Sequence, residues 1–200
     1  MARYTGPKWK INRRENATVL GHGEKWKRRP TLPGQFPILK KRPSDYAIQF
    51  REKQKVKRMY GMTEKQFVRF YKLATKSPGN TSTRLLQLLE LRADNVLFKL
   101  GFALTRAQAR QMISHGHILL NGKKHDVPSA ILSVGDEVTL VAEGQFKSYI
   151  GELEKQNKTF QVPAWLSKLE LGGKVASEPT RDQMDQSIKE RLIVELYSRK

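Results

Sequence analysis

Residues 92–122 read RADNVLFKLGFALTRAQARQMISHGHILLNG and predict a short helix, a second basic helix and a tight hairpin, in that order. Val96 and Leu100 have helical spacing, and Gly101 follows as the residue type that most readily adopts the left-handed conformation ending a helix. The first helix is therefore predicted to run from Asp94 to Leu100.

The second helix is predicted to run from Thr105 to about Ser114. Thr105 and Gln108 have the spacing of a capping box, which satisfies two amide groups at the start of a helix. Arg106 and Arg110 are four residues apart, so their guanidinium groups are expected on one flank of the helix. The other side carries the apolar residues Ala109, Met112 and Ile113.

A small antiparallel sheet is predicted to follow the two helices. Asn121-Gly122 readily adopts the positive backbone angles of a tight hairpin turn, and residues 117–127 supply its two strands. Gly135-Asp136 marks another turn before residues 137–142, whose apolar side chains alternate as in a half-buried strand. The module is expected to close near Gln145.

This module resembles the RNA-binding domain of the S four family of small-subunit ribosomal proteins. It carries, in order, the motifs RADN, LGFA, TR..AR, ISHGHI, NG and GD. Stretches outside the module resemble the same family, in its bacterial and organellar type: MARYTGP at 1–7, PGQ at 33–35, SDYAIQFREKQKVKRMYG at 44–61 and IVELYSR at 193–199. The resemblance covers nearly the whole chain.

An α+β fold is expected. The resemblance implies a mainly helical domain with an inserted RNA-binding module, made of two short helices and a small twisted antiparallel sheet, and a basic, largely irregular N-terminal extension. The expected limits are 1–43 for the extension, 44–90 for the helical domain, 91–145 for the module, 146–180 for an extension of this second domain with the return connection, and 181–200 for a C-terminal helix that completes the helical domain.

Helix boundaries are also readable in the helical domain. Pro43-Ser44 and Gly61 are expected to start and end one helix, and Thr63 with Gln66 to cap the next. Aromatic residues at packing intervals are interpreted as core rather than as platforms for stacking bases: Tyr46, Phe50, Tyr60, Phe67, Phe70 and Tyr71. Thr180 and Gln183 are expected to open the C-terminal helix, whose apolar face comprises Ile188, Leu192, Ile193, Leu196 and Tyr197.

The charge of the chain predicts a polyanionic partner. Lys and Arg number 38 against 19 Asp and Glu, which gives a formal net charge of +19. Residues 1–60 hold 17 of the basic and 4 of the acidic side chains, so this part is expected to contact phosphate most strongly. Residues 1–42 are rich in Gly and Pro and lack hydrophobic periodicity, and are expected to follow an RNA surface.

Predicted contacts with RNA come from basic side chains along the whole chain. Arg51, Lys55 and Arg58 form a stripe on one predicted helix, although such a stripe is often only a solvated face. Net charge and the family resemblance favour RNA contact. The predicted RNA-binding residues are Arg3, Lys8, Lys10, Arg13, Arg14, Lys40, Lys41, Arg42, Arg51, Lys53, Lys55, Lys57, Arg58, Arg69, Lys72, Arg84, Arg92, Arg106, Arg110, His115 and Lys123.

Two interpretations concern the module itself. Arg106 and Arg110 contact phosphate or pair with an acid such as Asp94, and the scarcity of nearby acid favours phosphate. Asp94-Asn95, at the start of a predicted helix, is interpreted as a structural cap.

No cofactor and no metal ion is expected. Cysteine is absent, which excludes disulfides and thiolate metal sites. In many members of the resembling family the segment after YTGP carries zinc-binding cysteines; Trp9 and Asn12 stand at the matching places here, which implies the zinc-free variant. The histidines lack the paired spacing of a zinc site on a helix and are expected in RNA contacts or local packing: His22, His115, His117 and His125.

The resemblance implies a structural constituent of the small ribosomal subunit. Such a protein binds the 5′ domain of small-subunit ribosomal RNA where several helices meet, and nucleates assembly. It also lines the path by which messenger RNA enters, where Lys40, Lys41 and Arg42 match basic positions, and it influences translational accuracy. Its expected protein neighbours are small-subunit proteins of the S five and S three families.

Two other functional classes were weighed against this one. Similar modules occur in pseudouridine synthases and some tyrosyl-tRNA synthetases, but residues 1–90 and 146–200 hold no room for such a catalytic domain, so no enzyme is expected. A free RNA chaperone or a repressor of its own messenger RNA remains open. No apolar run is long enough to span a bilayer and no leader is evident, so a cytoplasmic ribosome is expected, with an organellar ribosome as the alternative.

Overall fold

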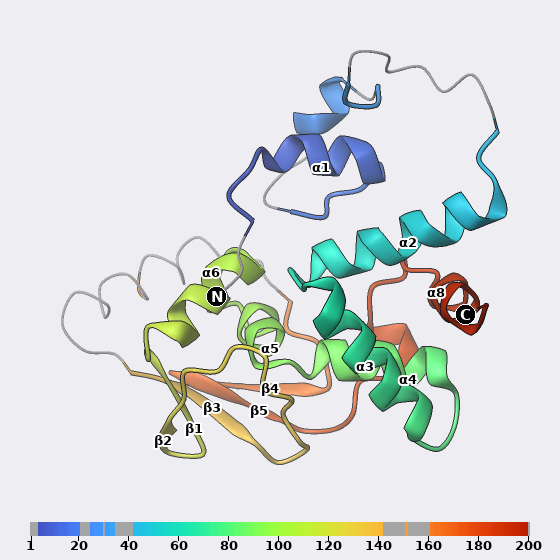
Figure 1. Cartoon of the computed structure of the whole chain (residues 1–200). Coiled ribbons are helices and arrows are strands. Elements are labelled where there is room, and N and C mark those ends of the chain that lie inside the picture. The colour runs from blue at the N-terminus through green and yellow to red at the C-terminus, as the bar shows by residue number, and fades with distance from the viewer. Residues whose placement is uncertain are drawn as a thin grey trace. The chain divides into compact units, whose positions relative to one another are not determined.

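A computed structural model describes residues 4–20, 25–29, 31–34, 42–141, 151 and 161–199 of the chain. It divides into two compact units, one formed by Met1–Leu85 with Gln186–Lys200 and the other by Leu86–Asp185. We call them the helical unit and the mixed unit. Figure 1 shows helices alone in the first and helices with a sheet in the second, which confirms the α+β prediction.

The helical unit is built on α2 (Asp45–Met59), α3 (Glu64–Lys76) and α8 (Glu190–Ser198), while α4 (Thr81–Glu90) begins in it. Ser44 caps α2 by accepting a hydrogen bond from the amide of Ala47, and Gly61 follows the helix with a φ of 57°. Thr63 and Gln66 form the predicted capping box of α3.

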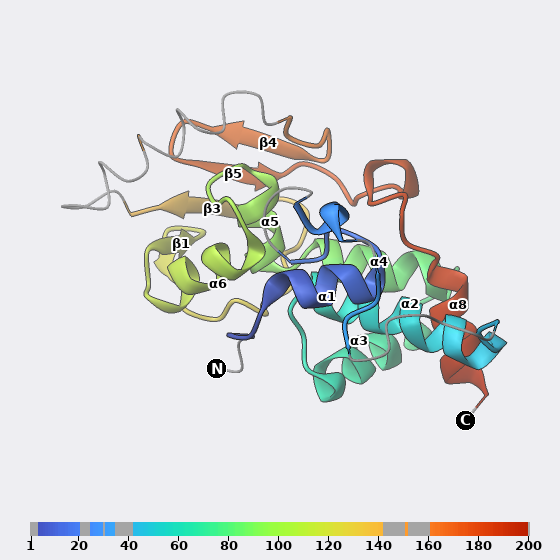
Figure 2. The same ribbon diagram turned by 90° about the horizontal axis from the view of Figure 1, so that it is seen from above.

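In the core of the helical unit α8 packs against α2 (Figure 2), and the Tyr197 ring of α8 reaches α3. Tyr60 and Phe67 are buried, and so is Ile193 of α8. The Tyr197 ring stacks on Tyr71 with 4.7 Å between ring centres. The C-terminal helix thus completes the helical unit.

The C-terminal segment is helical over a shorter range than predicted. The Thr180 capping box opens only a 3₁₀ turn, η2 (Arg181–Gln183), and α8 begins at Glu190. Residues between them pack on α2 in a non-helical conformation: Lys55 donates a hydrogen bond to the carbonyl of Ser187, and Glu52 accepts one from the amide of Lys189. These side-chain bonds take the place of intrahelical ones, and Ile188 is buried without being part of a helix.

Tyr46 is not a core residue, contrary to the prediction. It lies in the first turn of α2 and is 59% exposed, and Phe50 one turn later is only partly buried. Helical spacing placed Tyr46 and Phe50 on one arc correctly, but the Tyr46 side chain is exposed to solvent at the start of α2.

The N-terminal extension contains a helix, α1 (Lys8–Glu15), and a 3₁₀ turn, η1 (Lys25–Arg28). Asn16 ends α1 with a φ of 48°. The buried side chain of Asn12 accepts hydrogen bonds from the amides of Val19 (3.1 Å) and Leu20 (2.9 Å) and donates one to the carbonyl of Leu20 (3.1 Å). One amide side chain therefore fixes the returning loop on α1, in a segment too small to hold a large hydrophobic core.

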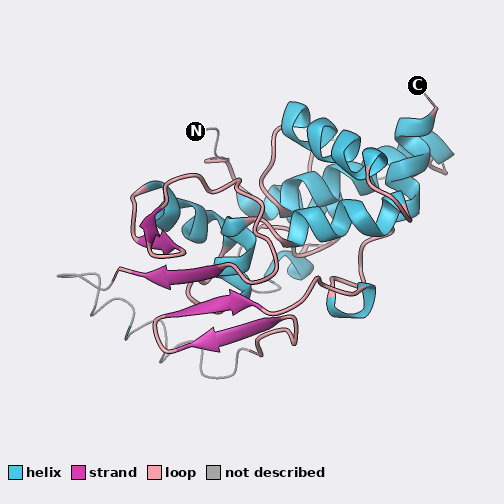
Figure 3. Ribbon diagram, turned by 90° about the horizontal axis from the view of Figure 1, so that it is seen from below, coloured by secondary structure: helices cyan, strands magenta, loops and turns pink. Residues whose placement is uncertain are grey.

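In the mixed unit, α5 (Ala93–Lys99) and α6 (Arg106–Ser114) cover one face of a five-stranded antiparallel sheet (Figure 3). The strand order is β2-β1-β3-β5-β4, with bounds Ile118–Leu120 for β1, Lys123–Lys124 for β2, Glu137–Leu140 for β3, Leu166–Leu169 for β4 and Gly172–Val175 for β5. Asn121 and Gly122 have positive φ angles, and Leu120 pairs with Lys123 across the predicted hairpin. Residues 142–145, at the predicted end of the module, lie outside the described residues.

Two details of the predicted helix ends need correction. Thr105 caps α6 by accepting from the amide of Gln108, but the Gln108 side chain accepts from the amide of Leu104, so only half of the capping box forms. The N-cap of α5 is Arg92, and Asp94 lies inside the first turn of that helix.

Close packing of β5 explains its two glycines. A Cβ atom on Gly173 would lie 2.4 Å from a methyl carbon of Leu100, at the end of α5. One on Gly172 would lie 2.3 Å from the carbonyl oxygen of Val138 in β3. The core under α5 and α6 includes Trp165 and Ile113, both fully buried.

Replacing Asn12 with Ala is predicted to free the loop after α1, because the amides of Val19 and Leu20 lose their acceptor. An unsatisfied buried donor costs roughly 1–3 kcal/mol. Hydrogen exchange should become faster at these two amides while amides of α6 keep their protection. As a control, Asn16→Gly, at an exposed position with positive φ, should leave exchange unchanged. Equal protection in Asn12→Ala and the parent protein would contradict this role.

Candidate nucleic-acid interface

Many of the basic residues predicted to bind RNA are paired with acids inside the protein. Glu15, at the end of α1, has a side chain that is 1% exposed and forms ion pairs with Arg51 (3.4 Å) and Arg58 of α2. Burial raises the pKa of Glu15, and the two arginines act in the opposite direction. Two residues of the predicted stripe of α2 therefore hold α1 in place, and the third, Lys55, pairs with Glu52 of α2 itself.

A second acid joins the helices of the helical unit. Glu64, at the start of α3, accepts hydrogen bonds from Lys53 (2.5 Å), Lys57 (3.0 Å) and the Tyr197 hydroxyl (2.9 Å). Burial alone would raise the pKa of Glu64, but these three donors lower it to about 2. Burial and the bond to Glu64 raise the pKa of Tyr197. Lys53 itself is buried.

A third acid lies at the centre of the mixed unit. Asp94 is 1% exposed and receives two hydrogen bonds from Arg92, Nε to Oδ1 at 3.1 Å and Nη2 to Oδ2 at 2.9 Å. Arg110 of α6 donates to the same carboxylate through Nε at 3.0 Å. Asp94 is thus structural, as predicted, but it ties α5 to α6 rather than capping a helix.

Asn95 extends this network. It is fully buried, donates to the carbonyl (2.8 Å) and the carboxylate (2.6 Å) of Glu90, and accepts from Nε of Arg106 at 2.8 Å. The Arg106 guanidinium also lies over the Phe98 ring, 4.8 Å from its centre. Arg106 and Arg110 share one flank of α6, as predicted, and both reach back to α5.

Some of the predicted RNA-binding arginines are thus engaged inside the mixed unit. Of the two alternatives for Arg110, the ion pair with Asp94 is present, because folding brings α5 beside α6 and supplies the acid that the local sequence lacks. Arg92 is buried, and Arg84 is half-buried. Contact of these arginines with RNA stays a prediction.

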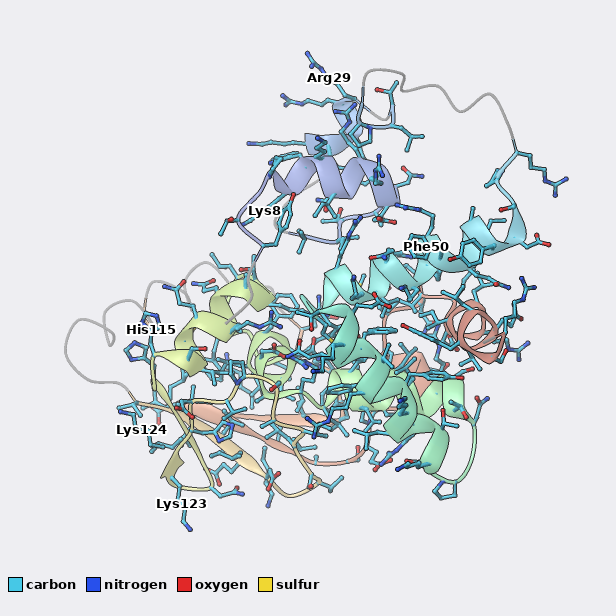
Figure 4. All side chains as sticks on the ribbon, in the orientation of Figure 1. Lys8, Arg29, Phe50, His115, Lys123 and Lys124 are labelled. Atoms are coloured by element: carbon cyan, nitrogen blue, oxygen red, sulfur yellow. The ribbon has the colours of Figure 1, made fainter. Side chains whose placement is uncertain are left out.

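Other predicted residues are exposed. In the N-terminal extension these are Lys8, Lys10 and Arg14. Arg13 donates hydrogen bonds to the carbonyl and the hydroxyl of Thr31. Figure 4 labels Lys8 together with Arg29, another exposed cation of this extension. The remaining exposed members of the predicted set are Arg42, Arg69, Lys72, His115 and Lys123, whereas Arg3, Lys40 and Lys41 lie outside the described residues.

The most regular group of available cations lies on α3. Lys65, Arg69, Lys72 and Lys76 are all exposed and follow one another at intervals of four, three and four residues. They line an open groove of about 530 Å³ with Val68, Leu73 and Glu64. Within the part of the chain that the structure describes, none of these four cations pairs with an acid. We call them the α3 stripe. Sequence analysis included Arg69 and Lys72 but missed Lys65 and Lys76, although the spacing is visible in the sequence.

A smaller basic group surrounds the β1–β2 hairpin. Figure 4 labels His115, Lys123 and Lys124 at this end of the mixed unit. All three are exposed, and the His115 ring stacks on that of His117 with 6.2 Å between centres. The Lys124 side chain lies against Gly116. A Cβ atom on Gly116 would lie 2.5 Å from the Cε atom of Lys124. Sequence analysis did not include Lys124.

Metal-binding clusters and membrane-spanning helices are both absent from the described residues. Among them, no group of three His, Asp or Glu side chains is placed to hold a metal ion. No helix in the described ranges is long and apolar enough to cross a membrane.

Comparison with known proteins agrees with this picture. Residues 3–90 match the family model described as the Ribosomal protein S4/S9 N-terminal domain, and residues 91–138 match the S4 domain. The chain is 47% identical over 212 residues to the small ribosomal subunit protein uS4 of Herpetosiphon aurantiacus. It is 44% identical over 208 residues to uS4 of Dictyoglomus turgidum and 43% identical over 202 residues to uS4 of Opitutus terrae. Each comparison covers the full length of both chains.

Replacing Asp94 with Asn is predicted to destabilise the mixed unit, because Arg92 would remain buried without its counter-charge. Breaking a buried ion pair in this way costs roughly 3–5 kcal/mol. Urea unfolding should show the loss as a lower midpoint. Asp126→Asn, an exposed change of the same kind, should stay within about 0.5 kcal/mol of the parent protein. A midpoint for Asp94→Asn that matches this control would contradict the structural role.

Glu64 is predicted to make the helical unit sensitive to acid. Its pKa is about 2 when folded and about 4.5 in the unfolded chain, so its contribution is complete above pH 4.5 and disappears as pH falls toward 2. In Glu64→Gln the free energy of unfolding should therefore decline less between pH 4.5 and 2 than in the parent protein. The exposed Glu170→Gln is the matched control and should follow the parent curve. Parallel curves for Glu64→Gln and the parent would be inconsistent with the lowered pKa.

Proposed function

Because the chain belongs to the uS4 family of small ribosomal subunit proteins, we propose that it binds the 5′ domain of small-subunit ribosomal RNA and helps to nucleate subunit assembly. It is a ribosomal protein with an S4 RNA-binding domain, and not an enzyme. What we propose is the particular RNA that it binds.

The observation that carries the proposal is the α3 stripe. Four cations at helical spacing present a row of charge that no acid of the described chain neutralises. Phosphate oxygens are the natural partners of such a row, and each contact releases counterions from the RNA. The exposed cations of the extension and of the β1–β2 hairpin add further contacts of the same kind.

The proposed mechanism depends on the cations that do not pair with acids inside the protein. Duplex RNA hides most base edges in a deep, narrow groove, so a junction is recognised through phosphates, 2′-hydroxyls and backbone shape. Glu15, Glu64 and Asp94 hold the helices that carry the basic groups in fixed positions within each unit. A fixed array of cations fits one arrangement of RNA helices better than others, which gives specificity for shape rather than for sequence.

Further roles extend the proposal. Arg42, one of the three basic residues expected along the incoming messenger RNA, is exposed just before α2. We propose contact with messenger RNA there, an effect on translational accuracy, and contacts with the S five and S three neighbours. Because the relatives named above are bacterial proteins, we place the ribosome in the cytoplasm.

A free regulator that represses its own messenger RNA is the second candidate. The same exposed cations would serve it, because phosphate contacts carry no sequence information. Preference for the ribosomal junction over other RNA distinguishes the two functions.

The proposal predicts that the purified protein binds the 5′ domain more tightly than an unrelated RNA of equal length, at raised as well as at low salt. Arg69→Gln/Lys72→Gln should weaken binding to the 5′ domain and lower the slope of affinity against salt by roughly one per lost phosphate contact. Filter binding across a salt series measures both quantities.

The matched control is Arg191→Gln/Arg199→Gln, which removes the same charge from exposed positions of the helical unit. It should reduce affinity for the 5′ domain less than the α3 pair does. Equal and steeply salt-sensitive binding of the parent protein to both RNAs would contradict the assigned target and favour the free regulator.

A further inference from the structure

The Tyr46 ring at the start of α2 is exposed and is not part of the core. Tyr46 is 59% exposed, and its ring stacks on Phe50 with 6.0 Å between centres and 17° between planes. Within the described part of the chain, no hydrogen bond engages the Tyr46 hydroxyl and no other ring lies on it. Among the large hydrophobic residues that the structure describes, Tyr46 is the most exposed.

Phe50 supports the Tyr46 ring from below and is itself held in place. Its ring, which Figure 4 labels on α2, is contacted by the Lys53 ammonium at 4.9 Å and the Arg51 guanidinium at 5.4 Å from the ring centre. Both cations are themselves held, Lys53 by Glu64 and Arg51 by Glu15. Phe50 is therefore fixed by the same ion pairs that join α1, α2 and α3, and Tyr46 stacks on a rigid support.

We propose that Tyr46 and Phe50 form a platform on which an unpaired base of RNA stacks. This inference rests on the proposed function, because it assigns a particular contact within an RNA-binding protein. Single-stranded nucleic acid is held by aromatic side chains that stack on bases together with cations that follow the phosphates. The outer face of Tyr46 supplies the first element and exposed Arg42, four residues earlier, supplies the second.

Charge favours RNA over a protein partner as the occupant. A formal net charge of +19 makes a polyanion the strongest partner for any exposed part of the chain. Stacking adds to that attraction without requiring a particular base, because every base has a flat face. The platform would thus capture one base that is displaced from a helix at the junction, while the α3 stripe binds phosphate.

The test compares binding of the full-length protein to a single-stranded oligoadenylate about 10 nucleotides long and to a duplex RNA hairpin of similar phosphate content. Tyr46→Ala should bind the single strand about tenfold more weakly, and bind the duplex with unchanged affinity. Tyr46→Phe keeps the ring and should bind both RNAs as the parent protein does. Ile48→Ala, at an exposed apolar position two residues away, is the matched control and should change neither affinity.

An unchanged affinity of Tyr46→Ala for the single strand would overturn the platform and leave a protein partner as the occupant of this surface. An equal loss for single strand and duplex would also overturn it. A thermal melt of each variant verifies that it folds. Replacing an exposed side chain should not change the melting temperature. Failure of the platform leaves the preference for the ribosomal 5′ domain intact, so the two proposals are tested separately.

Discussion

The fold depends on a few acids that each bind two cations in an otherwise strongly basic chain. Glu15 pairs with Arg51 and Arg58, Glu64 with Lys53 and Lys57, and Asp94 with Arg92 and Arg110. Each of these carboxylates lies where two or more helices meet within one unit. With 38 basic side chains against 19 acidic ones, a carboxylate placed between two helices offsets the repulsion between the cations that they carry. Burying such charges costs free energy. Removing one of these acids should therefore destabilise the packing of the helices that it joins.

This constraint divides the basic residues into those that pair with acids inside the protein and those that remain exposed. The stripe Arg51, Lys55 and Arg58 has the spacing of an RNA-binding face, yet its charges hold α1 and the segment before α8. The α3 stripe has equally regular spacing and faces solvent. Which stripe remains available to phosphate is decided by tertiary structure, because both look alike as sequence. The ribosomal function of the family and the position of the exposed charge together support the proposal that this protein fixes the shape of an RNA junction.

Much of the fold follows from local sequence signals. The capping box of α3, the positive φ angles at Asn121 and Gly122 and the end of α5 at Gly101 were predicted, because each depends on a few neighbouring residues. The strands β4 and β5 were not predicted as strands. Gly172–Val175 pairs with β3, far away in sequence, and β4 pairs only with β5 in the described sheet. The exposure of Tyr46 and the pairing of Arg110 with Asp94 also depend on which elements pack together. Periodicity places a residue on a face of its helix, but it does not say what that face meets.

Residue-resolved lysine acylation, measured by mass spectrometry with and without the 5′ domain RNA, tests most directly whether the acids divide the basic residues in this way. We expect Lys65, Lys72 and Lys76 to react readily in the free protein and to be protected by RNA. Lys53, which is buried against Glu64, should react slowly in both states. Unchanged reactivity of the α3 lysines on RNA binding, together with rapid acylation of Lys53 in the free protein, would contradict the account.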